Sequence, residues 1–277
     1  MEEYVYAAVF GVIQALTEFL PISSSGHLVL AAELTSDQAN DASFDVALHG
    51  GTLLAVLAYF RDDWAVMWLA GRRELRRHGL ALTRWRGRGK LALLLALGSV
   101  PGFIAGGLLQ LTAQDGLRQP LVVGIMLIAV GGVMWFADTR GRTDRRVRDV
   151  DGRGALFIGA AQALAVVPGT SRSGITISAG RIFGLSRHAA ARFSFLLSAP
   201  ITAGSLALLV RDAVEDHSVV AWGPMALGAI VAFLASMLVI RGLLGFLRRH
   251  GLGVFVWYRL VLGGVVLAGV AAGAFQG

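Results

Sequence analysis

The sequence contains no cysteine, which excludes a disulfide framework, a thiol nucleophile and a cysteine-ligated metal site. It also has little charge, since charged residues make up 16% of its 277 positions while hydrophobic residues make up 55%. A soluble domain carries about 25% charged residues. Neither a histidine-rich tract nor the H-E-x-x-H spacing of a zinc hydrolase is present. This composition predicts an integral membrane protein with several spans.

Two other classes of protein are disfavoured. The N-terminus, "MEEYVYAAVF", is acidic and has no basic segment before its apolar run, so we expect no cleaved signal peptide. The formal net charge of +7 would suit a nucleic-acid-binding protein. The arginines that produce this charge lie in loops between apolar stretches, so we expect no nucleic-acid partner.

Six apolar stretches are long enough to cross the roughly 30 Å core of a bilayer. They lie near residues 44–60, 91–111, 120–137, 188–210, 219–240 and 254–274. Two more apolar regions, 4–33 and 154–183, are each interrupted by proline, serine and glycine. We therefore expect an all-α polytopic protein with one integral membrane domain over residues 1–277.

The loops between these stretches differ in charge. Loops 61–90, 138–153 and 241–250 are rich in arginine, whereas loops 33–43, 112–119 and 211–218 hold only Arg118 and Arg211 against seven acidic residues. The positive-inside rule places the first set in the cytoplasm. We expect the 61–90 loop to do nothing beyond setting this orientation and contacting anionic membrane lipids.

With six spans threaded through these loops, the two interrupted regions cannot cross. Region 4–33 must leave and return on the outer side and region 154–183 on the inner side, so both are predicted to be re-entrant helical hairpins. Irregular backbone at membrane depth is tolerated only where it is buried in protein or lines a wet cavity. We therefore expect the two breaks to meet in a polar pocket.

The two interrupted regions share a motif at an offset of 148 residues. Gly11-x-x-Gln14-Ala15-Leu16 recurs as Gly159-x-x-Gln162-Ala163-Leu164, and Ser23-x-Ser25-Gly26 recurs as Ser171-x-Ser173-Gly174. Because the predicted orientations are opposite, the pattern indicates an inverted-topology repeat, with copies at about 4–137 and about 154–274. Such folds place their sites at the repeat interface near mid-membrane.

The first break carries side chains that are costly inside a membrane, namely Gln14, Glu18, Ser23, Ser24, Ser25 and His27. Gln14 and Glu18 are four residues apart and therefore share one helix face. An acid at membrane depth is by default a candidate functional residue. A serine of "PISSS" can cap a second half-helix, whose free N–H groups favour an anion. Asp45 and His49, at the start of the first span, are candidates for the mouth of the pocket.

The second break, "PGTSRSGITI", places Arg172 among Ser171, Ser173, Gly174 and Thr176. A guanidinium with hydroxyl and backbone N–H donors is phosphate-binding chemistry. A carboxylate, a histidine, hydroxyls and an arginine together meet the needs of phosphoryl transfer. Structural roles stay open at this point, because membrane serines often bond to neighbouring helices and Arg172 could pair with Glu18 only to neutralise it.

At these residues the chain resembles the bacitracin-resistance family of undecaprenyl-diphosphate phosphatases. The family's first motif, E/Q-x-x-x-E running into F-L-P-x-S-S-x-G-H, is matched from Gln14 to His27. Its second motif, P-G-x-S-R-S-G-x-T, is matched from Pro168 to Thr176. The segments "FDVALHGGTLLAVLAYF" and "GLSRHAAARFSFLLSAP" are also similar to the family, so the resemblance covers essentially the whole chain.

The resemblance implies hydrolysis of undecaprenyl diphosphate to undecaprenyl phosphate and inorganic phosphate. This reaction recycles the lipid carrier for peptidoglycan and other envelope polymers and confers bacitracin resistance. The resemblance also implies a divalent cation, Mg²⁺ or Ca²⁺, as cofactor and a multi-pass location in the cell membrane. It further implies an active site that faces the outer side, and a homodimer.

By position, the resemblance makes Glu18 the essential acid, Ser24 and His27 the catalytic serine and histidine, and Arg172 the clamp on the diphosphate. It makes Glu18 and Gln14 the candidate metal ligands, although Gln14 is one charge short of the glutamate found in other members. The further candidates for substrate binding are Gln14, Ser23, Ser25, Ser171, Ser173, Gly174 and Thr176. We favour Ser24 as nucleophile, with Glu18 or His27 taking its proton, while attack by His27 or by a metal-activated water stays open.

Two other functions fit parts of the pattern. Type-2 phosphatidic acid phosphatases share the "SGH" element, but they need a histidine and an aspartate after the arginine, and "SGITISAGRIF" supplies neither. A polyprenyl-phosphate transporter would also use an inverted repeat with two re-entrant hairpins. Transport alone does not need the group of Glu18, Ser24 and His27, which favours the enzyme.

Overall fold

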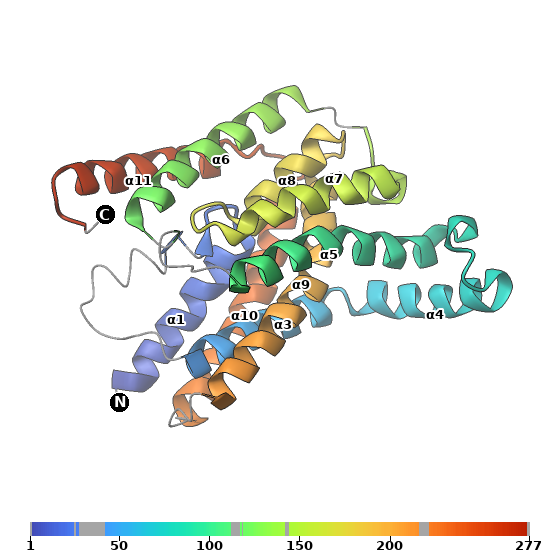
Figure 1. Cartoon of the computed structure of the whole chain (residues 1–277), viewed down its shortest axis with the longest axis horizontal. Coiled ribbons are helices and arrows are strands. Elements are labelled where there is room, and N and C mark those ends of the chain that lie inside the picture. The colour runs from blue at the N-terminus through green and yellow to red at the C-terminus, as the bar shows by residue number, and fades with distance from the viewer. Residues whose placement is uncertain are drawn as a thin grey trace.

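The computed structural model of the chain describes residues 2–24, 26–27, 42–111, 117, 119–141, 144–215 and 222–275. Within these ranges the fold is all-α, with short 3₁₀ turns at some of the connections (Figure 1). The helices are α1 (Glu2–Phe19), α3 (Ala42–Tyr59), α4 (Arg61–His78), α5 (Gly87–Leu111), α6 (Pro120–Arg140), α7 (Gly152–Ala163), α8 (Arg172–Ile182), α9 (Arg187–Glu215), α10 (Trp222–Phe246) and α11 (Gly253–Ala271).

Five of the six predicted spans are confirmed by length and composition, because α5, α6, α9, α10 and α11 are long and apolar enough to cross a membrane. The sixth prediction, 44–60, forms helix α3, but its apolar part, Phe44–Tyr59, is a shorter segment. That part is about 24 Å long at the helical rise of about 1.5 Å per residue. Large apolar side chains such as Leu238 (72% exposed) and Trp257 (70% exposed) point outward, as expected of a helical membrane protein.

Residues 61–90 do not form the loop that the arginine content led us to expect. Arg61–His78 is helix α4, which packs against α5, and the pair projects from the body of the molecule (Figure 1). Arginine, leucine and glutamate are good helix formers, so a charged run need not be irregular. Asp63 on α4 fixes the helix, because it accepts hydrogen bonds from Arg88 at 2.9 Å and Arg192 at 2.5 Å.

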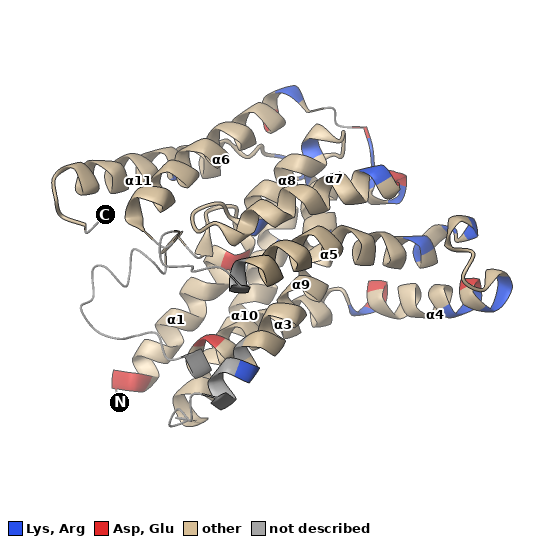
Figure 2. Cartoon of the chain, in the orientation of Figure 1, with Lys and Arg blue, Asp and Glu red and all other residues tan. Residues whose placement is uncertain are grey.

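The basic residues gather at one end of the molecule. Figure 2 shows them on α4, at the start of α5 and around the junction of α6 and α7, while the acidic first turn of α1 lies at the other end. The helix ends there are tied together by Asp138 of α6, which accepts a 2.6 Å hydrogen bond from Arg187 of α9. The molecule is therefore electrostatically polar along its length.

Both interrupted regions break where the sequence predicted. The helix α1 ends at Phe19, and the chain turns through Pro21 before it becomes helical again at Ser24. The helix α7 passes into a 3₁₀ turn (Leu164–Val166) and then into the segment that precedes α8. Ser23 (φ 81°) and Ser171 (φ 68°) are the non-glycine residues with positive φ in the described part of the chain. They are 148 residues apart, as in the sequence repeat.

The two breaks meet in the interior. Arg259 of α11 is 0% exposed, and its guanidinium donates to the carbonyl of Pro21 in the first break and to those of Gly169 and Thr170 in the second. It also donates to two carbonyls of α6. Carbonyl dipoles thus satisfy a buried cation that would otherwise be costly. One side chain therefore holds both irregular segments against α6.

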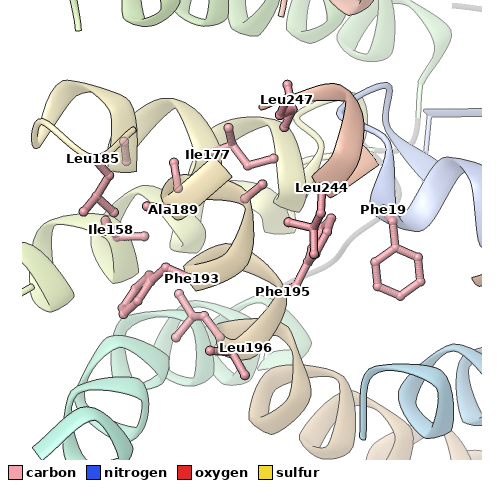
Figure 3. Close-up of a cluster of buried hydrophobic side chains, with 14 of the residues drawn as sticks. Phe19, Ile158, Ile177, Leu185, Ala189, Phe193, Phe195, Leu196, Leu244 and Leu247 are labelled. Atoms are coloured by element: carbon pink, nitrogen blue, oxygen red, sulfur yellow. The ribbon is translucent and has the colours of Figure 1, made fainter. Parts of the chain in front are cut away.

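The apolar core surrounds α9. Phe193, Phe195 and Leu196 of this helix are fully buried, and Figure 3 shows them among apolar side chains of neighbouring helices. Phe19, the last residue of α1, meets Phe195 edge to face with ring centroids 5.4 Å apart. This contact fixes the end of α1, one residue beyond the acid Glu18.

Candidate active site

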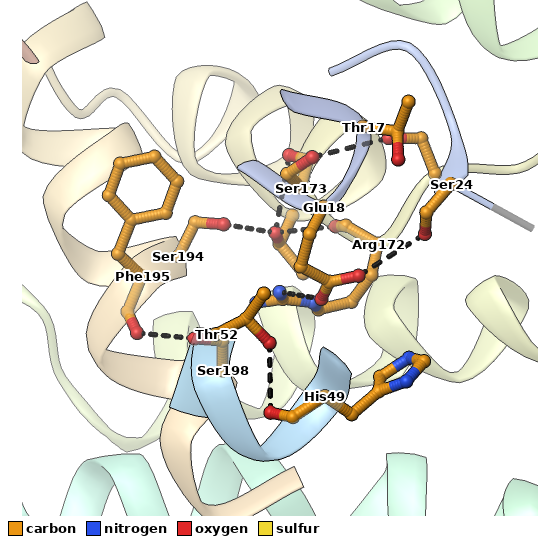
Figure 4. Close-up of polar contacts among 12 residues, drawn as sticks. Thr17, Glu18, Ser24, His49, Thr52, Arg172, Ser173, Ser194, Phe195 and Ser198 are labelled. Carbon is orange, nitrogen blue, oxygen red and sulfur yellow. Dashed lines mark hydrogen bonds and ion pairs between the residues drawn. The ribbon is translucent and has the colours of Figure 1, made fainter. Parts of the chain in front are cut away.

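Glu18 and Arg172 join the two breaks directly. The Nη2 of Arg172, the first residue of α8, donates a 2.6 Å hydrogen bond to Oε1 of Glu18, near the end of α1 (Figure 4). Both side chains are only 12% exposed. A buried ion pair of this kind is held only if each charge is compensated by the other. The two residues singled out in the two motifs are thus brought together across 154 positions of sequence.

Ser24 is the third member of this group. Its Oγ donates a 3.2 Å hydrogen bond to Oε2, the second carboxylate oxygen of Glu18. A carboxylate that accepts from a hydroxyl is placed to receive the hydroxyl proton when that oxygen becomes a nucleophile. The structure therefore puts a hydroxyl, a carboxylate and a guanidinium in one row.

A cavity of about 240 Å³ lies beside the ion pair. Its lining residues are Glu18, His49, Gly102, Gly106, Gln162, Ala165, Val166, Arg172, Ile201, Thr202 and Ser205. The second terminal nitrogen of Arg172, Nη1, is buried and has no hydrogen-bond partner among the described residues. Arg172 therefore keeps one donor for Glu18 and one that no acceptor in the described part of the chain uses.

The hydroxyls of the second motif bond within the protein. Ser171 Oγ accepts from the backbone N–H of Gly174 at 3.1 Å and so caps α8, which offsets the strain of its positive φ. Ser173 Oγ donates to the Leu20 carbonyl at 3.1 Å, and Thr176 Oγ1 donates to the Arg172 carbonyl at 2.7 Å. These three predicted phosphate donors support the breaks in this structure, and none lines the cavity. Their contact with substrate stays a prediction.

Ser23 and His27, which flank Ser24 in the first break, make hydrogen bonds that do not involve Glu18. Ser23 Oγ accepts from the N–H of Gly26 at 3.2 Å, which repeats the cap of Ser171. His27 Nδ1 lies 2.6 Å from the Ser23 carbonyl oxygen, and Nε2 lies 2.6 Å from the hydroxyl of Tyr258 on α11. A carbonyl only accepts, so Nδ1 carries the proton and Nε2 of a neutral ring accepts from Tyr258. Both ring nitrogens are thus engaged away from Glu18.

Gln14 and Ser25 complete the predicted set. Gln14 is 3% exposed, and its Nε2 has no hydrogen-bond partner in the described part of the chain. It lies one helical turn before Glu18 but is not among the residues that line the cavity. Ser25 lies outside the described residues.

Sequence reasoning missed several residues of the cavity wall. Gln162 was noticed only as part of the repeat, and Thr202 and Ser205 of α9 carried no signal, since isolated hydroxyls in apolar helices are common. Of the two residues proposed for the mouth of the pocket, His49 lines the cavity and Asp45 does not. Gln162, Thr202 and Ser205 form one wall because α5, α7 and α9 pack around the cavity, and no local sequence pattern encodes that packing.

The residues present fit a divalent cation only in part. The described residues contain no group of three or more His, Cys, Asp or Glu that could hold a metal ion. Glu18 is the one carboxylate among the described residues that line the cavity. Mg²⁺ is usually held by one or two carboxylates together with substrate phosphates. The donor set therefore fits a cation that arrives with a diphosphate better than one held by the protein alone.

Comparison with known proteins assigns a family to this arrangement. The family model described as "Bacitracin resistance protein BacA" matches residues 7–265. The chain is similar to an undecaprenyl-diphosphatase of Alcanivorax borkumensis, at 43% identity over 267 residues that cover 96% of this chain and 98% of the relative. It is also similar to undecaprenyl-diphosphatases of Nitrosococcus oceani (41% identity; 95% and 98% covered) and Pelotomaculum thermopropionicum (43%; 97% and 97%). The matches span the whole fold and both breaks.

Proposed function

We propose that the cavity beside Glu18 and Arg172 is the active site of this chain, which belongs to the bacitracin resistance protein family BacA and is an undecaprenyl-diphosphatase. The enzyme hydrolyses undecaprenyl diphosphate to undecaprenyl phosphate and inorganic phosphate. The observation that carries the proposed site is the 2.6 Å contact of Arg172 with Glu18, which links both breaks beside a cavity. A buried acid and a buried arginine at membrane depth are functional candidates by default.

Arg172 binds the diphosphate in this proposal. Its Nη1 is buried and free of protein acceptors among the described residues, so a phosphate oxygen can take that donor. A guanidinium fork suits phosphate because two N–H donors match two oxygens. As the phosphate draws the charge of Arg172 away from Glu18, the carboxylate becomes a stronger base.

Ser24 is the proposed nucleophile. Its Oγ attacks the terminal phosphorus, Glu18 takes the hydroxyl proton, and the bond from that phosphorus to the bridging oxygen breaks. Undecaprenyl phosphate leaves with the bridging oxygen. Water then attacks the phosphorus of the phosphoserine and the bond from phosphorus to Ser24 Oγ breaks. Glu18 returns its proton to Ser24 Oγ, and the oxygen and both protons of the water leave with inorganic phosphate as H₂PO₄⁻. The 3.2 Å hydrogen bond from Ser24 Oγ to Glu18 supports these roles.

A turnover quenched with denaturing detergent at neutral pH distinguishes the nucleophiles, because phosphoserine then survives acid treatment whereas phosphohistidine does not. Phosphoserine at Ser24, absent from Ser24→Ala, would support the mechanism. Phosphohistidine at His27 would replace Ser24 as the nucleophile, although the bonds of His27 to Ser23 and Tyr258 oppose this role in the present arrangement. A phosphoenzyme-free reaction in which the Ser24→Ala variant still turns over would point to attack by water.

The proposed cofactor is Mg²⁺ or Ca²⁺. Glu18 would hold it together with the phosphates of the substrate, with the amide of Gln14 as a second candidate on the same helix face. When bound, the cation would neutralise the developing charge on the phosphate oxygens. Gln14 and Glu18 carry one charge between them, so we expect the cation to bind weakly without substrate.

The proposed orientation places the cavity toward the outer side of the cell membrane. The basic end of the molecule (Figure 2) is cytoplasmic by the positive-inside rule. The cavity residues Gly102 and Gly106 lie about 21–27 Å along α5 from Arg88 at the basic end, at about 1.5 Å per residue. Thr202 and Ser205 of α9 are likewise about 15–20 Å beyond Arg192. This separation supports a site that opens away from the cytoplasm.

We also propose that the fold is an inverted repeat with two re-entrant hairpins, one built from the α1 break and one from α7 and α8. Structural features that recur at an offset of 148 residues support this repeat. Gly11 of α1 packs on the carbonyl of Gly228 in α10, and Gly159 of α7 packs on the carbonyl of Gly98 in α5. The caps by Ser23 and Ser171 are a second matched pair. Cysteine-accessibility labelling of both breaks from each side of the membrane would test the topology.

A polyprenyl-phosphate transporter is the second candidate, because inverted repeats with broken helices are transporter architecture. Lipid flipping in liposomes by Ser24→Ala or Glu18→Gln would reveal transport separate from hydrolysis. The absence of flipping by both variants would remove this role. The homodimer implied by the family resemblance also remains a proposal, and light scattering of the detergent-solubilised protein would test it.

The decisive experiment is phosphate release from undecaprenyl diphosphate by the purified protein. It should be run with Mg²⁺, with Ca²⁺ and with EDTA, beside Glu18→Ala and Arg172→Ala. Metal-dependent release that both variants lose would support the proposed site. Release that survives in either variant would move the active site elsewhere in the fold.

A further inference from the structure

We infer that Gln162 is a substrate-binding residue whose side-chain amide donates a hydrogen bond to the diphosphate. The inference rests on the active site proposed above. Gln162 lies in the last turn of α7, is 2% exposed, and lines the same cavity as Glu18 and Arg172. It therefore faces the substrate from the half of the fold that also supplies Arg172.

The side-chain amide of Gln162 is buried and has no hydrogen-bond partner within the described ranges of the chain. Neither Nε2 nor Oε1 has a hydrogen bond to any described residue. Buried amides are normally hydrogen-bonded, because an unsatisfied donor or acceptor carries the full cost of its desolvation. A fold that keeps such a group at the wall of a cavity holds it ready for a ligand. A residue needed only for packing would serve better as an apolar side chain of the same size.

The facing helix leaves room for this amide. A Cβ at Gly102 of α5 would lie 3.2 Å from Gln162 Nε2 and 2.9 Å from Cδ1 of Ile201. Glycine at this position thus keeps the space in front of the amide open. The gap lies on the cavity side of α7, because Gly102 is itself part of the cavity wall.

The chemistry of the cavity indicates which ligand atom the amide meets. Phosphate oxygens accept hydrogen bonds, and the NH₂ of glutamine offers two donors without adding charge. Arg172 already neutralises Glu18 with one nitrogen, so a neutral donor extends the phosphate site without unbalancing the buried pair. We therefore assign Nε2 of Gln162 to an oxygen of the diphosphate.

Gln162→Met tests this assignment, because methionine has a similar size and no hydrogen-bonding group. We expect kcat/KM for undecaprenyl diphosphate to fall about 10- to 100-fold, as for the loss of a hydrogen bond to a charged group. Most of the loss should be in KM, because the contact exists in both the bound substrate and the transition state. The thermal unfolding midpoint should be unchanged or higher, because an unsatisfied buried amide is removed.

Ser236→Ala is the matched control. Ser236 Oγ on α10 is also buried (0% exposed) and without a hydrogen-bond partner among the described residues, but Ser236 does not line the cavity. This variant should keep the KM and kcat of the unmodified enzyme. A lowered midpoint with unchanged KM in Gln162→Met would instead make Gln162 a structural residue and overturn the inference.

Three further variants separate the outcomes. Gln162→Glu keeps an acceptor but loses the NH₂ group, so its kcat/KM should be no better than that of Gln162→Met. Recovery of activity in Gln162→Glu with excess Mg²⁺ would show that the residue binds the cation, which contradicts the assigned donor role. Glu18→Ala and Arg172→Ala belong in the same series. If these two retain activity, the proposed active site is wrong; if they lose it while Gln162→Met keeps an unchanged kcat/KM, only this inference fails.

Discussion

Replacing Arg172 by lysine keeps the positive charge beside Glu18 but removes the fork of the guanidinium. In the structure Nη2 donates to Glu18 at 2.6 Å, while Nη1 is buried and has no protein acceptor in the described part of the chain. Lysine has one ammonium nitrogen on a flexible stem, so it cannot reproduce both contacts with the same geometry. We expect Arg172→Lys to fold like the unmodified protein and to lose most of its turnover.

The expected loss of turnover follows from the two terminal nitrogens of Arg172. Removing one preorganised donor to a transition-state oxygen costs about 2.7–4 kcal/mol, or about 10²–10³ in kcat. Arg172→Ala should lose at least as much activity. It would also leave the Glu18 carboxylate, 12% exposed, without a counter-ion, and breaking a buried pair in this way costs about 3–5 kcal/mol of stability. The lysine variant therefore separates catalysis from folding, whereas the alanine variant combines them.

The assay is phosphate release from undecaprenyl diphosphate in detergent, with thermal unfolding measured on the same preparations. Arg192→Lys is the matched control, since Arg192 also donates to a carboxylate, Asp63, at 2.5 Å but lies toward the basic end of the molecule. The control should retain the turnover of the unmodified enzyme. Near-normal kcat/KM in Arg172→Lys would refute the reasoning and show that Arg172 acts only as a charge.

Three other predictions concern packing, capping and the cofactor. Gly159→Ala should destabilise the protein by about 1–3 kcal/mol, because its Cβ would lie 2.2 Å from the carbonyl oxygen of Gly98. A Cβ at Gly50 would have nothing within 4 Å, so Gly50→Ala should not lower the unfolding midpoint. Equal losses of stability in the two variants would contradict the packing account. Ser171→Ala should cost about 1 kcal/mol in the unfolding free energy because it loses the cap of α8, and Ser171→Gly should cost less because glycine accepts the φ of 68°. EDTA should stop phosphate release and added Mg²⁺ should restore it, whereas activity in EDTA would exclude the cofactor.

The sequence predicts the breaks and the residues that meet there, because the relevant signals are local. Proline and serine in an apolar run interrupt a helix whatever surrounds them. The cost of a buried charge then makes Glu18 and Arg172 each need a partner, and the sequence leaves pairing between them open as a structural role. In the structure the two side chains are in contact at 2.6 Å.

The sequence does not predict contacts that depend on packing. Nothing local indicates that His27 bonds Tyr258, 231 residues away, rather than Glu18. Arg259 was equally invisible, since an arginine in an apolar helix gives no sign that it holds both breaks through their carbonyls. The charge of residues 61–90 indicates a loop, but Arg61–His78 forms helix α4. For His27 and Arg259 a long-range contact decides the outcome, whereas helix α4 follows from the local helix propensity of its residues.

Glu18 and Arg172 do not occupy equivalent positions in the two copies of the sequence repeat. At an offset of 148, Glu18 corresponds to Val166 and Ser24 to Arg172, so each half carries one member of the ionic pair at a different position. Val166 lines the same cavity as Glu18 and Arg172. An acid moved to this position can therefore face Arg172 from the half of the fold that carries Arg172 itself.

The double variant Glu18→Val, Val166→Glu separates the two roles assigned to the acid. We expect it to unfold at a higher temperature than Glu18→Val alone, because Arg172 regains a counter-ion in a buried setting. Phosphate release should stay lost, because the 3.2 Å contact through which we propose that Glu18 takes the proton of Ser24 is not rebuilt. Recovered phosphate release would mean that the acid serves only to neutralise Arg172. An unfolding midpoint no higher than that of Glu18→Val would mean that position 166 does not reach the guanidinium.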